Sequence, residues 1–282
     1  MAYAYFIYNF KKMKTKLLLF CAIISSCVMT IAQEIKMRPI GLAEIVVSYE
    51  LDQLCDYPNQ YRAEDWRETG TLILEIGNGI AHSYVVEEHN DIIKQFTTFY
   101  AKNRWNLEPN LHALLGETFM GYPDKGELTQ IVNLDAAGVF QYTEAQPKIS
   151  WKLMPERKDI LGYNCQRATC SFRGREYEAW FTPDVPLGYG PWKFQGLPGL
   201  ILEIADTKNE YHFTAKGIEK PKQEKQMMIF DEEIRTIKRT RALKMEAMAH
   251  KDHGLFAADY GIRFTLEGSE HDAMPYYPIE KK

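Results

Sequence analysis

The sequence predicts an α+β fold that is mainly β, with an antiparallel meander sheet and two helices. Short runs rich in β-branched and aliphatic residues, such as 41–50 and 67–77, are typical of strands. The pair Asn78-Gly79 between two such runs is a strong signal for a two-residue hairpin turn. Apolar residues at helical spacing occur near 91–104 and near 231–250, and we expect a helix in each segment.

The segment 165–182 predicts a second hairpin whose register can be read from the sequence. If Arg173-Gly174 forms the turn, Cys170 lies opposite Tyr177, and the small and apolar residues share one buried face. A shift by one residue would place Cys170 against Glu176, which the hydrophobic pattern disfavours.

Further strand pairs follow from the same alternation. Short strands are expected at 130–134 and 139–143, joined by a turn at 135–138. The runs 200–204 and 211–215 alternate apolar and polar residues around a polar turn. Stacking their apolar triplets places Glu203 directly opposite His212.

The two helices have recognisable start and stop signals. Asn90 or Asp91 is suited to cap the first helix. In the second, Asp231 caps the start, Gly254 ends it, and an apolar stripe runs through residues such as Met245 and Met248. We expect this helix to pack on the sheet with Arg241 reaching to water; the alternative is a lid over a concave face, with methionines touching a ligand.

The N-terminus predicts export. Met13 is followed by lysines and a short apolar stretch, and Thr30 and Ala32 occupy the small-residue positions of a cleavage site. We therefore interpret 1–32 as an upstream extension plus signal peptide, with the true start at Met13 and cleavage after Ala32. The alternative is a lipoprotein attached through Cys27. Both interpretations place the protein in the periplasm or at the outer membrane.

Charge and composition limit the partners and the number of domains. The predicted signal segment carries four lysines and no acid, so its removal takes the formal net charge from −4 to −8. Nucleic acid is therefore an unsuitable partner. Residues 33–282 contain no composition shift, repeat or low-complexity stretch, which indicates a single β-rich domain without a further transmembrane segment.

A resemblance to a known family rests on about fifty residues around the stretches ILGYNC, RGREYEAWFTPDVP and GPWKFQGLPGLI. This region resembles the GLPGLI family of exported bacterial proteins, named after the motif at 196–201. The resemblance implies an export signal and an antiparallel, β-rich domain of largely unknown function, with no catalytic residues to carry over. The layout is also similar to the strongly curved half-barrels of periplasmic lipoprotein carriers, an analogy of fold only.

Few residues suggest catalysis or metal binding. Glu203 and His212 could form an acid–base pair, but the sequence places no nucleophile beside them, so a solvated cross-strand pair is the favoured interpretation. His250 and His253, near His271-Asp272, are too few and too scattered for a typical zinc site. We expect no catalytic residue, no metal and no cofactor.

The stretch GPWKFQGLPGLILEI at 190–204 is the best candidate for ligand binding. Its glycines and prolines permit a tightly folded crossing that fixes an aromatic and basic cluster. One interpretation is a plug that fills one end of the core; the other is a rigid lip for an apolar or peptide ligand. We expect one aromatic ring to be buried and the other partly exposed. The candidate ligand-binding residues are Trp180, Trp192, Lys193, Phe194 and Gln195.

The mature chain keeps Cys55, Cys165 and Cys170. Cys170 belongs to the buried face of its hairpin, whereas Cys165 lies on the other face at the start of the strand. In an oxidising compartment we therefore predict a bridge between Cys55 and Cys165, with Cys170 a buried free thiol.

These observations favour an exported, non-enzymatic envelope or periplasmic protein that binds an apolar or peptide ligand or acts like a chaperone. Two alternatives remain open: a hydrolase that uses Glu203 and His212, and a structural component of an outer-membrane assembly bound to another membrane protein.

Overall fold

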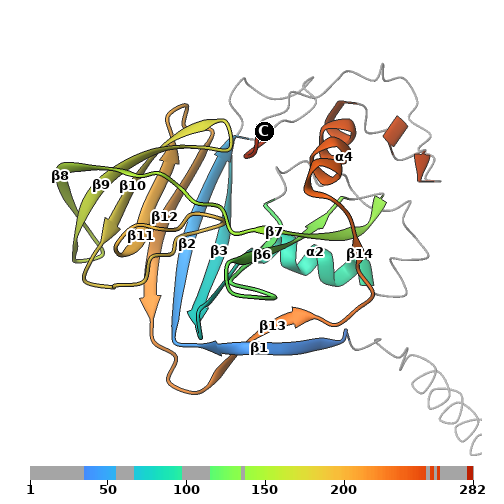
Figure 1. The fold of residues 1–282 in the computed structure, drawn as a ribbon, viewed down its shortest axis with the longest axis horizontal. Helices are drawn as coiled ribbons and strands as arrows, with labels where there is room; N and C mark the ends of the chain where they lie inside the picture. The colour runs from blue at the N-terminus through green and yellow to red at the C-terminus, as the bar shows by residue number, and fades with distance from the viewer. Residues whose placement is uncertain are drawn as a thin grey trace, which may run out of the picture. The chain divides into compact units, whose positions relative to one another are not determined.

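A computed structural model describes residues 35–54, 67–96, 115–134, 137–251, 255–256, 259–260 and 278–281. All of these except residue 35 belong to one compact unit, 36–282 (Figure 1). The predicted signal peptide, Cys27 and Cys55 lie outside the described residues. No helix of the described part is long and apolar enough to cross a membrane.

The fold is mainly β, and its main sheet is antiparallel except at one edge. Within the described residues this sheet contains twelve strands in the order β14-β7-β6-β5-β4-β3-β2-β12-β11-β10-β9-β8. The strands that follow one another from one edge are β8 (Lys152–Ile160), β9 (Tyr163–Phe172), β10 (Arg175–Thr182), β11 (Leu200–Asp206) and β12 (Tyr211–Glu219). The rest are β2 (Ile45–Leu54), β3 (Arg67–Gly77), β4 (Ile80–Val85), β5 (Glu117–Met120), β6 (Glu127–Asn133), β7 (Val139–Ala145) and β14 (Arg235–Thr236).

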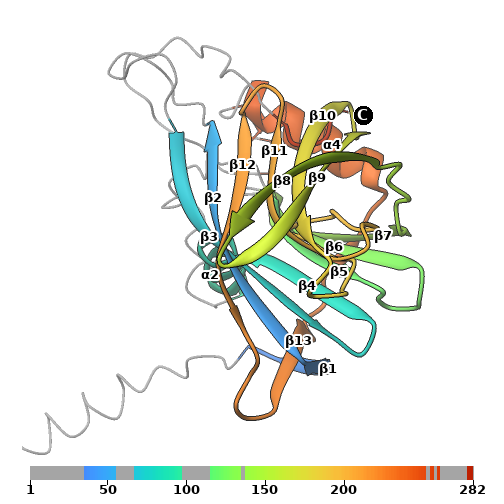
Figure 2. The same ribbon diagram turned by 90° about the vertical axis from the view of Figure 1, so that its left-hand side faces the viewer.

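Two sequential meanders therefore make up the sheet, and they meet where β12 pairs with β2. Only β14 is parallel to its neighbour, β7. Figures 1 and 2 show that the sheet is strongly curved, as predicted. A separate antiparallel pair joins β1 (Met37–Ala43) to β13 (Lys225–Phe230).

Both predicted two-residue turns are confirmed. Asn78 and Gly79 have φ angles of 53° and 76°, and Arg173 and Gly174 have φ angles of 50° and 85°. These positive angles belong to the turn whose twist matches that of the flanking strands. The second turn sets the predicted register, with Cys170 opposite Tyr177 and both residues buried.

The predicted register of β11 with β12 is wrong by two residues. Ala205, not Glu203, lies opposite His212, and Glu203 lies opposite Thr214. The connection has four residues, 207–210, and the Asp206 carboxylate accepts a hydrogen bond from Tyr211 N across it at 2.8 Å. A two-residue shift leaves every side chain on its own face, so the alternation of apolar residues does not discriminate between the two registers.

Both helices exist, but their starts differ from the prediction. The first, α2, spans Val86–Phe96 and begins directly after β4; residues 97–104 lie outside the described part. The second, α4, spans Arg239–Lys251, because the residues before it form β14 and pair with β7. Asp231 therefore does not cap it, and Met248, assigned to the apolar stripe, is 53% exposed.

The described residues form two hydrophobic clusters. The larger lies between the long strands and the loop that joins β10 to β11, and it includes Tyr49, Tyr177, Phe194 and Phe213. The smaller lies where Ala242 and Met245 of α4 pack with residues of β6 and β7. Arg241 of α4 is exposed, as the packed-helix interpretation predicted.

The loop between β10 and β11 approaches the sheet so closely that one position has room only for glycine. A Cβ atom at Gly199 would lie 2.0 Å from the carbonyl oxygen of Thr182. We therefore expect Gly199→Ala to lower the free energy of unfolding by about 2–3 kcal/mol in urea titrations. Gly70→Ala is the matched control, because its Cβ would meet neighbours at 3.4 Å. A control variant that loses as much stability would contradict the steric argument.

Candidate functional site

The loop between β10 and β11 folds back on itself around Trp192. Gly190 N donates to Phe194 O at 2.8 Å, and Gly196 N donates to Gly188 O at 2.9 Å. Trp192 adopts the left-handed region, with φ of 53°, and its own N–H donates to the buried Ser83 hydroxyl at 2.9 Å. The chain thus reverses direction at Trp192.

Both aromatic rings of this loop are buried, so the expectation of one exposed ring is wrong. Trp192 is 2% exposed and Phe194 is 0% exposed. Their ring centroids lie 5.3 Å apart in an edge-to-face arrangement, and Tyr177 lies 4.7 Å from Phe194 in the same manner. Because the chain turns at Trp192, the alternation of an extended segment does not apply, and both rings enter the core.

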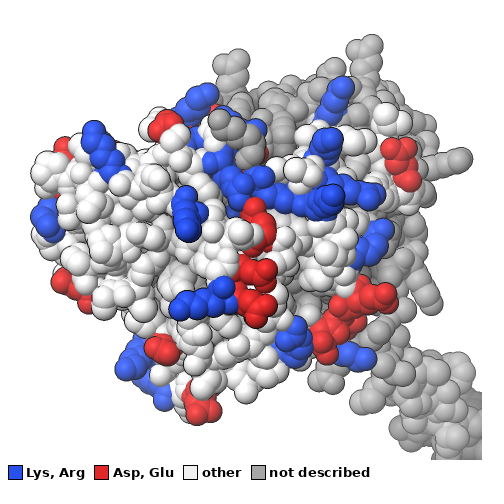
Figure 3. Space-filling model, in the orientation of Figure 1, with Lys and Arg blue, Asp and Glu red and all other residues white. Residues whose placement is uncertain are grey.

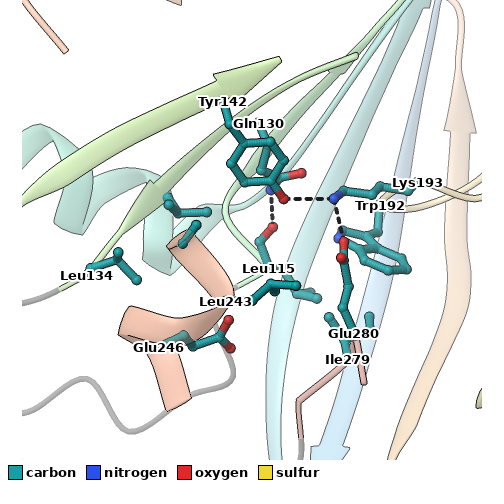
Figure 4. Close-up of a pocket in the computed structure, with 12 residues that line it drawn as sticks. Leu115, Gln130, Leu134, Tyr142, Trp192, Lys193, Leu243, Glu246, Ile279 and Glu280 are labelled. Atoms are coloured by element: carbon teal, nitrogen blue, oxygen red, sulfur yellow. Dashed lines mark hydrogen bonds and ion pairs between the residues drawn. The ribbon is translucent and has the colours of Figure 1, made fainter. Parts of the chain in front are cut away.

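Lys193 is also fully buried, which sequence reasoning missed. Its ammonium lies 2.9 Å from the Tyr142 hydroxyl and 2.5 Å from Glu280 Oε1 (Figure 4). It also lies 3.3 Å from Glu144 Oε1. Burial alone would lower the pKa of Lys193, but Tyr142 and the two carboxylates raise it. Burial would raise the pKa of Glu280, yet the neighbouring cations, Lys193 first, hold it below its usual value. Both groups are therefore charged.

The cavity beside this ion pair is too small for a ligand. Its volume is about 20 Å³, which is room for one water molecule. Figure 4 shows it between Lys193 and Glu280 on one side and α4 on the other. Gln195 is already bonded to the segment between β7 and β8. Its side chain donates to Pro147 O at 2.8 Å, and its backbone carbonyl accepts from Trp151 Nε1 at 2.8 Å. This geometry favours the plug interpretation of the loop.

Trp180 lies elsewhere, on β10, and packs against the larger hydrophobic cluster. It is partly buried, and its strand neighbours are Arg167 on β9 and Glu203 on β11. Trp180 Nε1 donates to Glu178 Oε1 at 3.2 Å, and Lys158 Nζ lies 4.4 Å from the ring centroid. We call this group the Trp180 strip: Lys158, Arg167, Glu178, Trp180, Glu203 and His212.

Glu203 and His212 do meet, but their geometry does not suit hydrolysis. His212 Nε2 lies 3.3 Å from Glu203 Oε1, and the same nitrogen lies 3.3 Å from the Thr214 hydroxyl. A nucleophile–base–carboxylate arrangement needs the two ring nitrogens to face different partners. Here the carboxylate competes with the hydroxyl for one nitrogen, and it also pairs with Lys158 at 2.7 Å.

A buried chain of imidazoles and carboxylates runs from β3 to α2. His82 Nε2 lies 3.1 Å from Glu117 Oε2, His89 Nδ1 lies 2.6 Å from Glu117 Oε1, and His82 Nδ1 lies 3.5 Å from Glu75 Oε2. Burial would lower the pKa of His82, but Glu117 and Glu75 raise it. Part of this chain was readable from sequence, because the Asn78-Gly79 turn places Glu75 opposite His82.

Glu88 of α2 lies beside this chain and is also buried. Its carboxylate accepts hydrogen bonds from Gly116 N at 2.7 Å and from Leu115 N at 3.2 Å. Burial raises its pKa to about 7, although the two backbone donors act in the opposite direction. These groups bond to one another and to the backbone inside the protein, so we assign the chain to folding rather than to chemistry.

The remaining candidate residues are the cysteines and the C-terminal histidines. Cys165 and Cys170 are buried and are not bonded to each other; Cys165 is more buried than its assigned face implied. Cys55 lies outside the described residues, so the bridge with Cys165 stays a prediction. Among the described residues no cluster of His, Cys, Asp or Glu is arranged to hold a metal ion. His250 Nδ1 lies 2.9 Å from Glu246 O, whereas His253, His271 and Asp272 lie outside the described part.

Comparisons with known proteins give one family and one set of solved structures. Residues 84–243 match the family model described as N-glycanase peptide, N-terminal domain. PNGF-II in a P21 crystal form has a TM-score of 0.46 and 15% identity, over 75% of this chain and 34% of PNGF-II. Its C2 crystal form has the same TM-score and identity, over 73% and 33%. This chain thus spans about a third of the length of PNGF-II. No curated protein sequence matches it.

Removal of the Lys193 charge tests the buried ion pair. We expect Lys193→Met to lower the free energy of unfolding by about 2–3 kcal/mol, because Glu280 loses its buried lysine partner and keeps Arg239. Lys216→Met is the control, since Lys216 and Glu50 form an exposed pair at 2.8 Å, and it is expected to cost less than about 1 kcal/mol. If both variants lost the same free energy of unfolding in chemical denaturation, burial would not determine how much the ion pair stabilises the protein.

Glu88 predicts a pH dependence of stability. Its pKa of about 7 lies above the ordinary value of 4.5, so the folded protein binds the proton more tightly than the unfolded chain. The stability that protonated Glu88 contributes is therefore fully present at low pH and is lost as the pH rises through about 7. Between about pH 5 and pH 8, we expect Glu88→Gln to gain thermal stability relative to the unmodified protein. Glu87→Gln, at the exposed neighbouring position, should follow the unmodified protein at every pH.

Proposed function

The chain belongs to the family of the N-glycanase peptide, N-terminal domain, and from this premise we propose that it is an exported, non-catalytic protein of the periplasm or cell envelope that binds the glycan of a glycopeptide. The sequence predicted a peptide as one possible ligand, and the family description restricts this to a peptide that carries a sugar. The predicted signal peptide supports export. The resemblance to the GLPGLI family supports the same location and stays a prediction.

The Trp180 strip is the observation that carries this proposal. A sugar ring has an apolar face, which an aromatic side chain can cover, and hydroxyl groups, which need charged or polar partners. Trp180 supplies a partly exposed ring, while Arg167 and Glu178 supply a donor and an acceptor at its edge. Arg167 Nε lies 2.8 Å from Glu178 Oε2, so the two groups hold each other in place.

Lys158 covers the Trp180 ring and does not prevent this role. Its side chain is 36% exposed and pairs with Glu203, which is 21% exposed. An ion pair near the surface contributes less than about 1 kcal/mol, so a ligand can displace the lysine at low cost. The displaced ammonium remains close enough to donate to a sugar hydroxyl.

The contacts of His212 weigh against catalysis by the Glu203–His212 pair. Its Nε2 atom is shared by Glu203 and Thr214, which leaves the imidazole without the orientation that general-base catalysis requires. The hydrolase alternative therefore has no geometric support within the described residues.

A pair of matched peptides tests the function. We expect the full chain to bind an N-glycosylated peptide and not the same peptide without its glycan, with the glycopeptide unchanged in mass after incubation. Trp180→Ala should weaken binding about tenfold or more, since it removes the central aromatic contact. Lys216→Ala, on the same sheet but in the separate pair with Glu50, should bind normally. Equal binding of both peptides, or release of the glycan, would contradict the proposal.

A further inference from the structure

Positive charge is concentrated in one short segment of a chain with a net charge of −4. Residues 235–244, RTIKRTRALK, contain five basic residues and no acidic one. They form β14, the connection after it and the first turns of α4. Figure 3 shows Lys and Arg gathered in a band that reaches the region of α4.

An open hollow of about 440 Å³ lies at this segment. This volume falls in the range of sites for small molecules, about 300–1,000 Å³. The hollow is lined by Thr236, Ile237, Lys238, Thr240, Arg241 and Lys244. Three cations and two hydroxyl groups thus face one space, with no carboxylate among the lining residues.

The three lining cations differ from the other basic residues of the segment. Arg239 Nε pairs with Glu280 Oε2 at 2.7 Å, and Arg235 Nη2 donates to Ala137 O at 2.6 Å. By contrast, Lys238, Arg241 and Lys244 make no side-chain hydrogen bond or ion pair with any described residue. Among the described residues, therefore, nothing compensates these three charges.

Their positions are also unfavourable for the helix. Lys238, Arg241 and Lys244 are spaced three residues apart, so like charges follow one side of α4. The first turn of α4 contains no acid, although the N-terminal end of a helix is the positive end of its dipole. Lys238 precedes the helix where an acceptor side chain is preferred, and lysine carries only donors. Proteins break such local rules mainly at functional sites.

We propose that this hollow binds the sulfate or phosphate ester group of an anionic saccharide. The guanidinium of Arg241 suits two oxygens of such a group, the two lysines neutralise its charge, and the hydroxyls of Thr236 and Thr240 donate to the remaining oxygens or to the sugar. A bound anion would screen the repulsion among the three cations. It would also interact favourably with the positive end of the helix dipole, where the cations do not. The saccharide portion rests on the proposed function, whereas the oxyanion portion does not.

Calorimetric titration of the full chain at low salt tests the proposal. The probes are glucose 6-sulfate, inorganic sulfate and unsubstituted glucose. We expect glucose 6-sulfate to bind more tightly than inorganic sulfate and glucose to show no binding. Arg241→Glu should weaken binding of glucose 6-sulfate about tenfold or more. Lys251→Ala removes an exposed cation from the other end of α4 and should leave binding unchanged.

Thermal unfolding of the Arg241→Glu variant without ligand shows whether Arg241 serves ligand binding or the stability of the fold. Because Arg241 sits unfavourably at the start of α4, we expect Arg241→Glu to raise Tm by about 1–4 °C while it abolishes stabilisation by glucose 6-sulfate. A fall in Tm, or unchanged binding by this variant, would overturn the site. Equal affinity for inorganic sulfate would overturn the saccharide assignment and support the oxyanion site. Since glycopeptide binding is tested through Trp180, failure there and failure here are distinguishable.

Discussion

The buried pair of Lys193 and Glu280 is the contact on which the arrangement of the described residues depends. Charges fully removed from water cost several kcal/mol unless their partners are close, so each charged group constrains the others. Lys193 brings the loop after β10 against Tyr142 and Glu144 of β7, and Glu280 holds Arg239 at the first residue of α4. The same network therefore fixes the path into β11, which carries Glu203 of the Trp180 strip, and the start of the helix that lines the basic hollow.

Local patterns predicted the parts of the fold that local contacts determine. The Asn78-Gly79 and Arg173-Gly174 turns set their hairpins, because a two-residue turn leaves one register that buries the apolar face. The β11–β12 register was missed because its four-residue loop, 207–210, permits shifts by two residues that keep every side chain on its face. The start of α4 was missed because β14 is held by pairing with β7, a distant strand.

The candidate sites were less predictable, since their partners lie far apart in the chain. Nothing near Lys193 in sequence indicates that Glu144 and Glu280, 49 and 87 residues away, surround it, so a surface role was a reasonable prediction. Glu117 joins His82 from a strand 35 residues later, beyond the reach of any hairpin argument. The basic segment 235–244 was visible in the sequence, but its significance depends on knowing which of its cations have partners.

The pairing of β12 with β2, where the two meanders meet, affects how the chain folds. The hairpins with two-residue turns, β3–β4 and β9–β10, close over a few residues, and such steps take microseconds. By contrast, β12 pairs with β2, and the Tyr49 hydroxyl reaches Ile201 O across 152 residues. Bringing such distant segments together requires a large loss of chain entropy before any contact repays it. We therefore expect β8–β12 and β2–β7 to assemble as separate halves, and the meeting of β12 with β2 to set the folding rate.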